Sequence, residues 1–195
     1  MNAKKLIIGM APWFLFTVLV HRLGVDGVAF AAVASCLTAA AMAAFELSRG
    51  RSVKILDCAG IATFGLMAVL AYGGGPAVES ALVGFGRGGS TLVLAAVMAV
   101  SAVTVPFTEQ YARESVDPRY WGSPVFRAKN KAISLVWAGA VATMGIGHVL
   151  AGLLGAQTGP VNLVLNWALP VAMFLLAVNQ TKAIVARDQA PASMG

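Results

Sequence analysis

The stretch RAKNKAISLVWAGAVATMGIGHVLAGLL, residues 127–154, decides the fold class. It opens with Arg127, Lys129 and Lys131 and then runs to residue 154 without another Lys, Arg, Asp or Glu. A helix needs roughly 20 apolar residues to cross the hydrocarbon core of a bilayer, and basic residues gather at its cytoplasmic end. The stretch is therefore typical of a membrane-spanning helix that begins in the cytoplasm.

Five other apolar runs surround this stretch in the chain of 195 residues. Hydrophobic residues make up 58% of the sequence and charged residues 11%, which is about half the charged fraction of a typical soluble domain. Helices are the default spanning element because lipid offers no partner to the backbone. We expect an all-α, polytopic bundle of six transmembrane helices. The predicted spans are residues 6–23, 25–47, 53–72, 91–105, 130–154 and 160–185, within one domain of residues 1–188 and before a flexible tail, 189–195.

The distribution of basic residues predicts how this bundle is oriented. If both termini lie in the cytoplasm, only Arg22 and Arg87 fall on the outer side, and the other twelve of the 14 Lys and Arg residues fall inside. Positive charge in cytoplasmic loops is the strongest sequence signal of orientation. We expect a multi-pass protein of the bacterial inner (plasma) membrane. The inner residues are Lys4, Lys5, Arg49, Arg51, Lys54, Arg113, Arg119, Arg127, Lys129, Lys131, Lys182 and Arg187.

Two joints between spans are more than short turns. Residues 73–90 are rich in glycine, and the sequence leaves open whether they form an interfacial helix, a loop or an extension of the fourth span. Residues 106–129 form a cytoplasmic connector. Small residues also recur every four positions on the second and fifth spans, which predicts close helix packing or, for an outward stripe, a homodimer. These residues are Ala31, Ser35, Ala39 and Ala43, and Gly139, Thr143, Gly147, Ala151 and Gly155.

The connector opens with PFTEQYARE, residues 106–114, and the spacing predicts a short amphipathic helix in the membrane plane. Phe107, Tyr111 and Glu114 share one face, whereas Glu109 and Arg113 form an i,i+4 pair. We expect the aromatic side chains to point toward lipid or the bundle and the charges to point outward. Trp121 suits an interfacial belt. The connector is either a docking or headgroup-binding element or a plain anchor. The headgroup candidates are Arg113, Arg119, Arg127 and Lys129.

The same motif, followed by Trp121, Ser123-Pro124, Phe126, Asn130 and Trp137, resembles a pattern found in small bacterial multi-pass membrane proteins. In size and topology these resemble the intracellular septation protein A family. The resemblance implies an envelope or division-associated role, and it supplies no catalytic residues.

Polar groups within spans are functional candidates because their burial is costly. His148 lies as far before the last hairpin as Asn166 lies after it, so the two are expected at one depth. Pro170 deprives the Asn166 carbonyl of its helical donor. The pair is either a site for a proton, an ion or a polar substrate or a structural hydrogen bond. A further alternative is that His21 and His148 are the axial ligands of a haem.

No metal-ligand cluster, nucleotide loop or catalytic motif stands out in the sequence. The placement of the basic residues favours the lipid bilayer and its anionic headgroups, rather than nucleic acid, as the partner. The expected function is a non-enzymatic envelope protein that acts through helix contacts, in a homo-oligomer or with an envelope partner, and through the connector. The alternative is a small transporter or channel that uses His148 and Asn166. No cofactor is expected besides the haem alternative.

Overall fold

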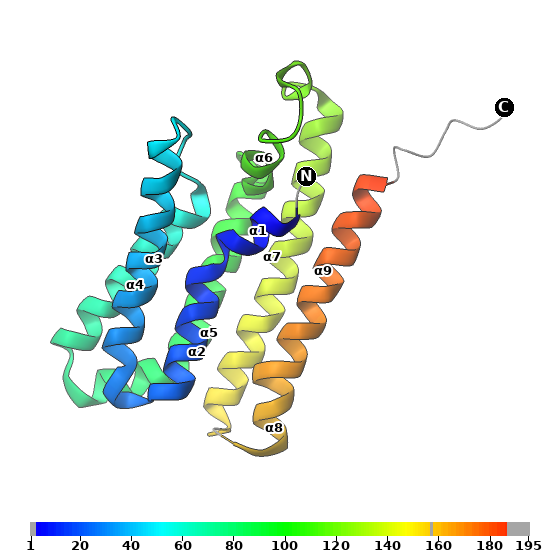
Figure 1. The fold of residues 1–195 in the computed structure, drawn as a ribbon. Coiled ribbons are helices and arrows are strands. Elements are labelled where there is room, and N and C mark those ends of the chain that lie inside the picture. The colour runs from blue at the N-terminus through cyan, green and yellow to red at the C-terminus, as the bar shows by residue number, and fades with distance from the viewer. Residues whose placement is uncertain (1–2, 157, 187–195) are drawn as a thin grey trace.

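The fold is a bundle of helices, seen in a computed structural model that describes residues 3–156 and 158–186 (Figure 1). Every regular element in those residues is helical, so the all-α prediction is confirmed. The tail predicted at 189–195 lies outside the described residues. The α-helices are α1 Ala3–Gly9, α2 Ala11–Leu23, α3 Val28–Ser48, α4 Ile55–Gly73, α5 Gly75–Val103, α6 Phe107–Ala112, α7 Pro124–Leu153, α8 Gly159–Leu163 and α9 Leu169–Ala186. The 3₁₀ turns are η1 Val25–Gly27 and η2 Pro118–Tyr120, and η3 Val164–Ala168 is a π-helical segment.

Five of the six predicted spans are long and apolar enough to cross a membrane, which indicates a multi-pass membrane protein. The five spans also leave many large apolar side chains exposed on the bundle surface, as lipid contact requires. They are Val25–Ser48, Ile55–Gly73, Gly75–Val103, Pro124–Leu153 and Gly159–Ala186.

The first predicted span, residues 6–23, is not one continuous helix. It is broken at Met10 into α1 and the shorter apolar helix α2, Ala11–Leu23. Pro12 explains the break, because proline has no amide to donate and occupies the first turn of the new helix. A helix of 13 residues is about 20 Å long, which is shorter than the hydrocarbon core.

Residues 75–90 of the glycine-rich joint are helical and belong to α5, whereas Gly73 ends α4 and Gly74 is the bend between the two helices. Of the three alternatives that the sequence leaves open for this joint, the structure has the extension of the fourth span. At 29 residues α5 is about 43 Å long. It lies at the centre of the bundle, where it contacts α2, α3, α4, α6 and α7.

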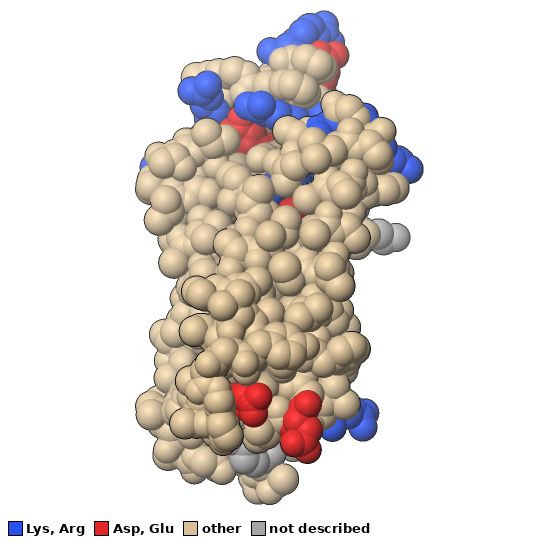
Figure 2. Space-filling view, turned by 90° about the vertical axis from the view of Figure 1, so that its left-hand side faces the viewer, with Lys and Arg blue, Asp and Glu red and all other residues tan. Residues whose placement is uncertain are grey.

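The bundle has two distinct ends (Figure 1). The connector end, at the top of the view, carries α1, α6, the α3–α4 loop and the last turn of α9. The hairpin end, at the bottom, carries the α2–α3 and α4–α5 turns and α8. On the face drawn in Figure 2, charged side chains gather mainly at the connector end, and a broad uncharged band separates them from a few at the hairpin end. That band is the part of the surface suited to lipid.

Close packing of α5 on α7 depends on glycines that the sequence stripes did not single out. A Cβ atom at Gly88 would lie 2.9 Å from the backbone nitrogen of Val149, and one at Gly152 would lie 2.7 Å from the carbonyl oxygen of Gly84. Small residues let helix backbones approach in lipid, where the hydrophobic effect gives no drive. The seam joining these two helices therefore tolerates no side chain at either position.

The predicted stripe on α3 is confirmed as a packing seam, because all four of its residues are buried and α3 packs on α4. The stripe on α7 is only half right. Gly147 and Ala151 are buried, whereas Gly139 and Thr143 are exposed, and Gly155 is exposed beyond the end of the helix. The exposed half lies along a helix whose other face meets α5, so it does not contribute to that contact.

Helix α9 is the outermost of the long helices. It packs mainly on α7, and its only buried residues are Ala177 and Thr181. Trp137 of α7 donates its indole N–H to the Thr181 hydroxyl at 3.0 Å. Most of the remaining residues of α9 are apolar and at least partly accessible. This helix and α2 bound a space at the side of the bundle.

Candidate functional site

The PFTEQYARE motif packs into the connector end instead of lying on its surface. Phe107, Thr108, Glu109 and Tyr111 are each at least 95% buried. Thr108 donates its hydroxyl to the carbonyl of Asn130 at 2.8 Å, and the Phe107 amide donates to the Ser101 hydroxyl at 3.3 Å. Polar groups of α5 and α7 thus satisfy the Phe107 amide and the Thr108 hydroxyl inside the protein.

This burial corrects part of the amphipathic-helix prediction. The pairing of Glu109 with Arg113 is confirmed, but Glu109 is buried and does not point outward. The aromatic residues Phe107 and Tyr111 contact the bundle, not lipid. The physical reason is that α6 is short, so that α1, α5 and α7 cover it from several sides.

A charged cluster joins the motif to the α3–α4 loop and to α1. Lys54 Nζ lies 2.9 Å from Glu46 Oε1 and 2.8 Å from Glu114 Oε1. Lys5 pairs with the other oxygen of Glu114, and Arg51 pairs with Glu46. Three cations therefore neutralise two carboxylates. One of these cations, Lys54, also acts on a third carboxylate, Asp57, which is buried in the first turn of α4. We call these six residues the charged cluster.

The cluster shifts the titration of its members that lie outside the spans. Burial opposes ionisation of Glu114, but hydrogen bonds from Lys5 and Lys54 hold its pKa below its ordinary value. Burial likewise opposes the charge of Lys54, but hydrogen bonds to Glu114 and Glu46 raise its pKa. Both groups are therefore charged at neutral pH, and all members of the cluster except Asp57 form ion pairs.

The headgroup candidates lie mostly on the surface. Arg119 and Arg127 are exposed, and Lys129 is half-buried. Arg119 pairs with Asp117, and Arg113 lies over the ring of Trp121 at 5.1 Å. Arginine side chains at the connector end thus remain accessible and contact the neighbouring Asp117 and Trp121.

His148 and Asn166 meet as the hairpin geometry predicts. Their Nδ1 and Oδ1 atoms lie 2.8 Å apart, and both residues are buried. The Asn166 amide nitrogen donates in turn to Asn162 at 2.8 Å. Because Oδ1 only accepts, Nδ1 must carry the proton in this arrangement, and the neutral ring keeps Nε2 as an acceptor.

The π-helical segment η3 holds Asn166 in place. It ends two residues before Pro170, whose missing amide leaves the Asn166 carbonyl without its α-helical donor. π-Helical turns are frequent at functional sites. Here Gly147 lets η3 come close to α7, because a Cβ atom there would lie 3.2 Å from the carbonyl oxygen of Leu165.

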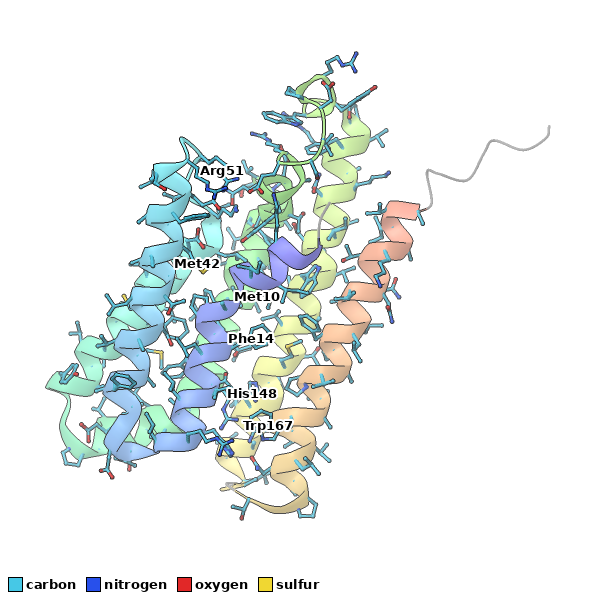
Figure 3. The ribbon with its side chains drawn as sticks, viewed as in Figure 1. Met10, Phe14, Met42, Arg51, His148 and Trp167 are labelled. Carbon is cyan, nitrogen blue, oxygen red and sulfur yellow. The ribbon has the colours of Figure 1, made fainter. Side chains whose placement is uncertain are left out.

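A cavity of about 350 Å³ lies beside this pair, between α2, α5, α7 and the η3–α9 helix. Of the fifteen side chains that line it, four carry a hydroxyl, amide or imidazole: Thr17, Thr91, His148 and Asn166. Met10 and Phe14 lie toward the connector end, and His148 and Trp167 lie toward the hairpin end (Figure 3). The cavity is thus apolar along most of its length and polar at one wall.

The cavity also reaches the surface of the bundle. Phe14, Val171 and Leu175 line it, although each is about half exposed. They belong to α2 and α9, so the opening faces sideways. In a bilayer this side of the bundle contacts lipid and not water.

Arg87 is the residue that the sequence assigned only to the outer loop. It lies within α5, is 9% exposed, and its Nη1 atom has no hydrogen-bond partner among the described residues. Its charge acts on His148. Thr91 and Leu94, one and two turns along the same face of α5, line the cavity.

The two histidines have different surroundings. His21 is exposed, and its ring packs edge-on against Trp167 at 5.2 Å, whereas His148 is bound to Asn166. Within residues 3–156 and 158–186, no group of three or more His, Cys, Asp or Glu is arranged to hold a metal ion.

Sequence reasoning found the polar pair but missed the charged cluster and Arg87. In the sequence, Lys5 and Lys54 indicate only the orientation of the bundle. Nothing in the sequence shows that the α3–α4 loop meets the connector. Arg87 could have been recognised only if residues 73–90 had been assigned to the fourth span, because it would then lie inside an apolar helix.

No protein-family model, curated protein or solved structure matches this chain. The resemblance to septation protein A therefore stays a prediction.

Proposed function

We propose that this protein binds an apolar or amphipathic molecule from the bilayer in the cavity between α2, α7 and α9. The observation that carries the proposal is a cavity of about 350 Å³ with apolar walls, a sideways opening and one polar wall. Small-molecule sites are typically apolar, with a few placed polar groups, and measure roughly 300–1,000 Å³. The alternative of a small transporter uses the same site, with binding as its first step.

The walls favour a lipid-soluble ligand over an ion. A bare ion needs several charged or carbonyl ligands to replace its water. The cavity offers His148 and Asn166, which already bind each other, and two threonines. An apolar chain, by contrast, would contact methionine, tryptophan, phenylalanine and leucine side chains along the cavity.

Tryptophan fluorescence tests the proposal directly. Trp13 lines the cavity but is 6% exposed, so a quencher in the bulk lipid does not reach it easily. The probe is methyl 9,10-dibromostearate, added to the purified protein in nanodiscs. We expect saturable quenching that is lost in a Trp13→Phe, Trp167→Phe double variant. Non-saturable quenching equal in both proteins would rule the proposal out.

A cavity-filling variant gives the matched control. Val141 is fully buried on the cavity wall, whereas Leu135 on the same helix is exposed. Val141→Phe should weaken the quenching, because added side-chain volume displaces the ligand. Leu135→Phe should leave it unchanged. If a second copy of the chain fills the opening instead, Val141→Phe would change the oligomeric state and not the binding of the ester.

We further propose six spans, with α1 and α2 together forming the first, in the bacterial inner membrane with both termini in the cytoplasm. In support, the described chain begins and ends at the connector end, as an even number of crossings requires (Figure 1). The basic residues gather there too. Reporter fusions after residues 50 and 120 should read cytoplasmic, and those near residues 24 and 80 should read periplasmic. One clear reversal would overturn this topology.

The envelope role implied by the septation-protein resemblance is a second proposal, in which the connector binds anionic lipid. The exposed residues Arg119 and Arg127, on a connector that also carries half-buried Trp121, support it. Arg119→Glu with Arg127→Glu should lower the preference of the protein for vesicles containing phosphatidylglycerol over phosphatidylcholine alone. Lys182→Glu, also exposed but on α9, is the control. An unchanged preference would remove this role from the connector.

A further inference from the structure

We propose that the ligand of the cavity carries an anionic head group, a carboxylate or a phosphate, which binds Arg87 at the hairpin end. This inference rests on the proposed function and adds the chemical class of the ligand.

The first argument is the state of the Arg87 side chain. Among the described residues no carboxylate lies in ion-pair distance of it, and Nη1 is buried without a hydrogen-bond partner. A charged group inside a span is costly and is normally paired. An arginine that only anchored the helix would extend its guanidinium group to water, whereas Arg87 is 9% exposed. The site therefore lacks an anion.

The second argument is the position of Arg87 relative to the cavity. Arg87, Thr91 and Leu94 succeed one another on one face of α5, and the last two line the cavity. The Thr91 hydroxyl donates to the Arg87 carbonyl at 2.7 Å, which keeps that hydroxyl from competing for the ligand. A molecule with its chain along the apolar wall would thus present its head group near the guanidinium.

The third argument is chemical fit. The guanidinium group is planar, always charged and matches the two oxygens of a carboxylate or phosphate. No Lys or Arg side chain is among the described residues that line the cavity. Discrimination between an acid and its neutral ester would therefore depend on Arg87, which lies one turn of α5 beyond Thr91.

Two probes with the same chain test the inference: 9,10-dibromostearate, at a pH where it is ionised, and its methyl ester. Quenching of Trp13 should saturate at about tenfold lower concentration for the acid, since a charge-assisted hydrogen bond in a buried site has about that effect. In Arg87→Gln this preference should vanish with the affinity of the ester unchanged. Arg87→Lys should keep part of the preference. Arg22→Gln, an exposed arginine at the same end, should keep all of it.

The outcomes separate the inference from the proposed function. Equal affinity for acid and ester in the unaltered protein would overturn the anionic head group but leave the apolar ligand. Saturable quenching by neither probe would overturn both. If Arg87→Gln does not fold, the ratio of acid to ester affinity in the unaltered protein still decides. Inorganic phosphate should not displace the acid at equal concentration. Displacement at equal concentration would show that a free anion, and not an amphiphile, is the ligand.

Discussion

Lys54 at the start of α4 and Glu114 just after α6 lie with Nζ and Oε1 2.8 Å apart, although the whole of α5 separates them in the sequence. The same lysine binds Glu46 at the end of α3. Gln110 of α6 adds a hydrogen bond, because its side-chain oxygen accepts from the Ile55 amide at 2.8 Å. The connector thus fastens the α3–α4 hairpin to the rest of the bundle.

Removing Lys54 should therefore destabilise the protein strongly. Lys54→Ala leaves Glu46 and Glu114 buried next to each other without their shared cation. We expect a loss of about 2–3 kcal/mol in the free energy of unfolding. Thermal unfolding of the detergent-solubilised protein, followed by circular dichroism, measures it. Lys131→Ala, an exposed lysine at the same end, should change the melting temperature little. Equal effects of the two changes would contradict the role of the cluster.

The cluster also predicts how stability depends on pH. The folded pKa of Glu114 lies below its ordinary 4.5, so its contribution is present above that value and is lost as pH falls through the folded pKa. The folded pKa of Lys54 lies above its ordinary 10.5, so its contribution is present below that value and is lost as pH rises through the folded pKa. Melting temperature should be highest between the two limits. Glu114→Gln should reduce the fall on the acid side, and an unchanged acid profile would count against the pairing.

Gly9 and Tyr111 form a tight contact that a double-mutant cycle can measure. The Tyr111 hydroxyl is buried without a hydrogen-bond partner and would overlap a Cβ atom at Gly9. Tyr111→Phe should cost little or stabilise by about 1 kcal/mol, because it removes an unsatisfied polar group. Gly9→Ala should destabilise the protein, and adding Tyr111→Phe should recover part of the loss. Strictly additive effects would mean that the two residues do not touch.

The hydrogen bond between His148 and Asn166 should show a modest coupling energy. In lipid such bonds measure about 0.6 kcal/mol on average and up to about 1.7 kcal/mol. His148→Leu, Asn166→Leu and the double variant give the coupling from unfolding in detergent. Coupling near zero would indicate that the two side chains do not bind in the membrane. His148→Gln should preserve stability and, if the imidazole contacts ligand, weaken the quenching of Trp13.

The sequence alone determined the class of fold, because membrane helices satisfy their backbone locally and need only length and apolarity. Residues 127–154 predict α7 by themselves, and four other spans follow from the same signal. The meeting of His148 and Asn166 was also readable, since two residues equally distant from a tight hairpin must lie at one depth. Pro12 was a readable signal for the break at Met10.

Only the tertiary structure decided which polar residues are buried and what they face. Burial of Phe107, Glu109 and Tyr111 depends on α1, α5 and α7 closing around a six-residue helix, which no local pattern encodes. The pairing of Lys54 with Glu114 depends on two distant loops meeting at one end of the bundle. Arg87 became a candidate site residue because the structure includes it in α5, where its side chain is buried and has no carboxylate as a partner among the described residues. A sequence shows where charged residues occur, but only the packing of the helices shows which of them are buried and which groups neutralise them.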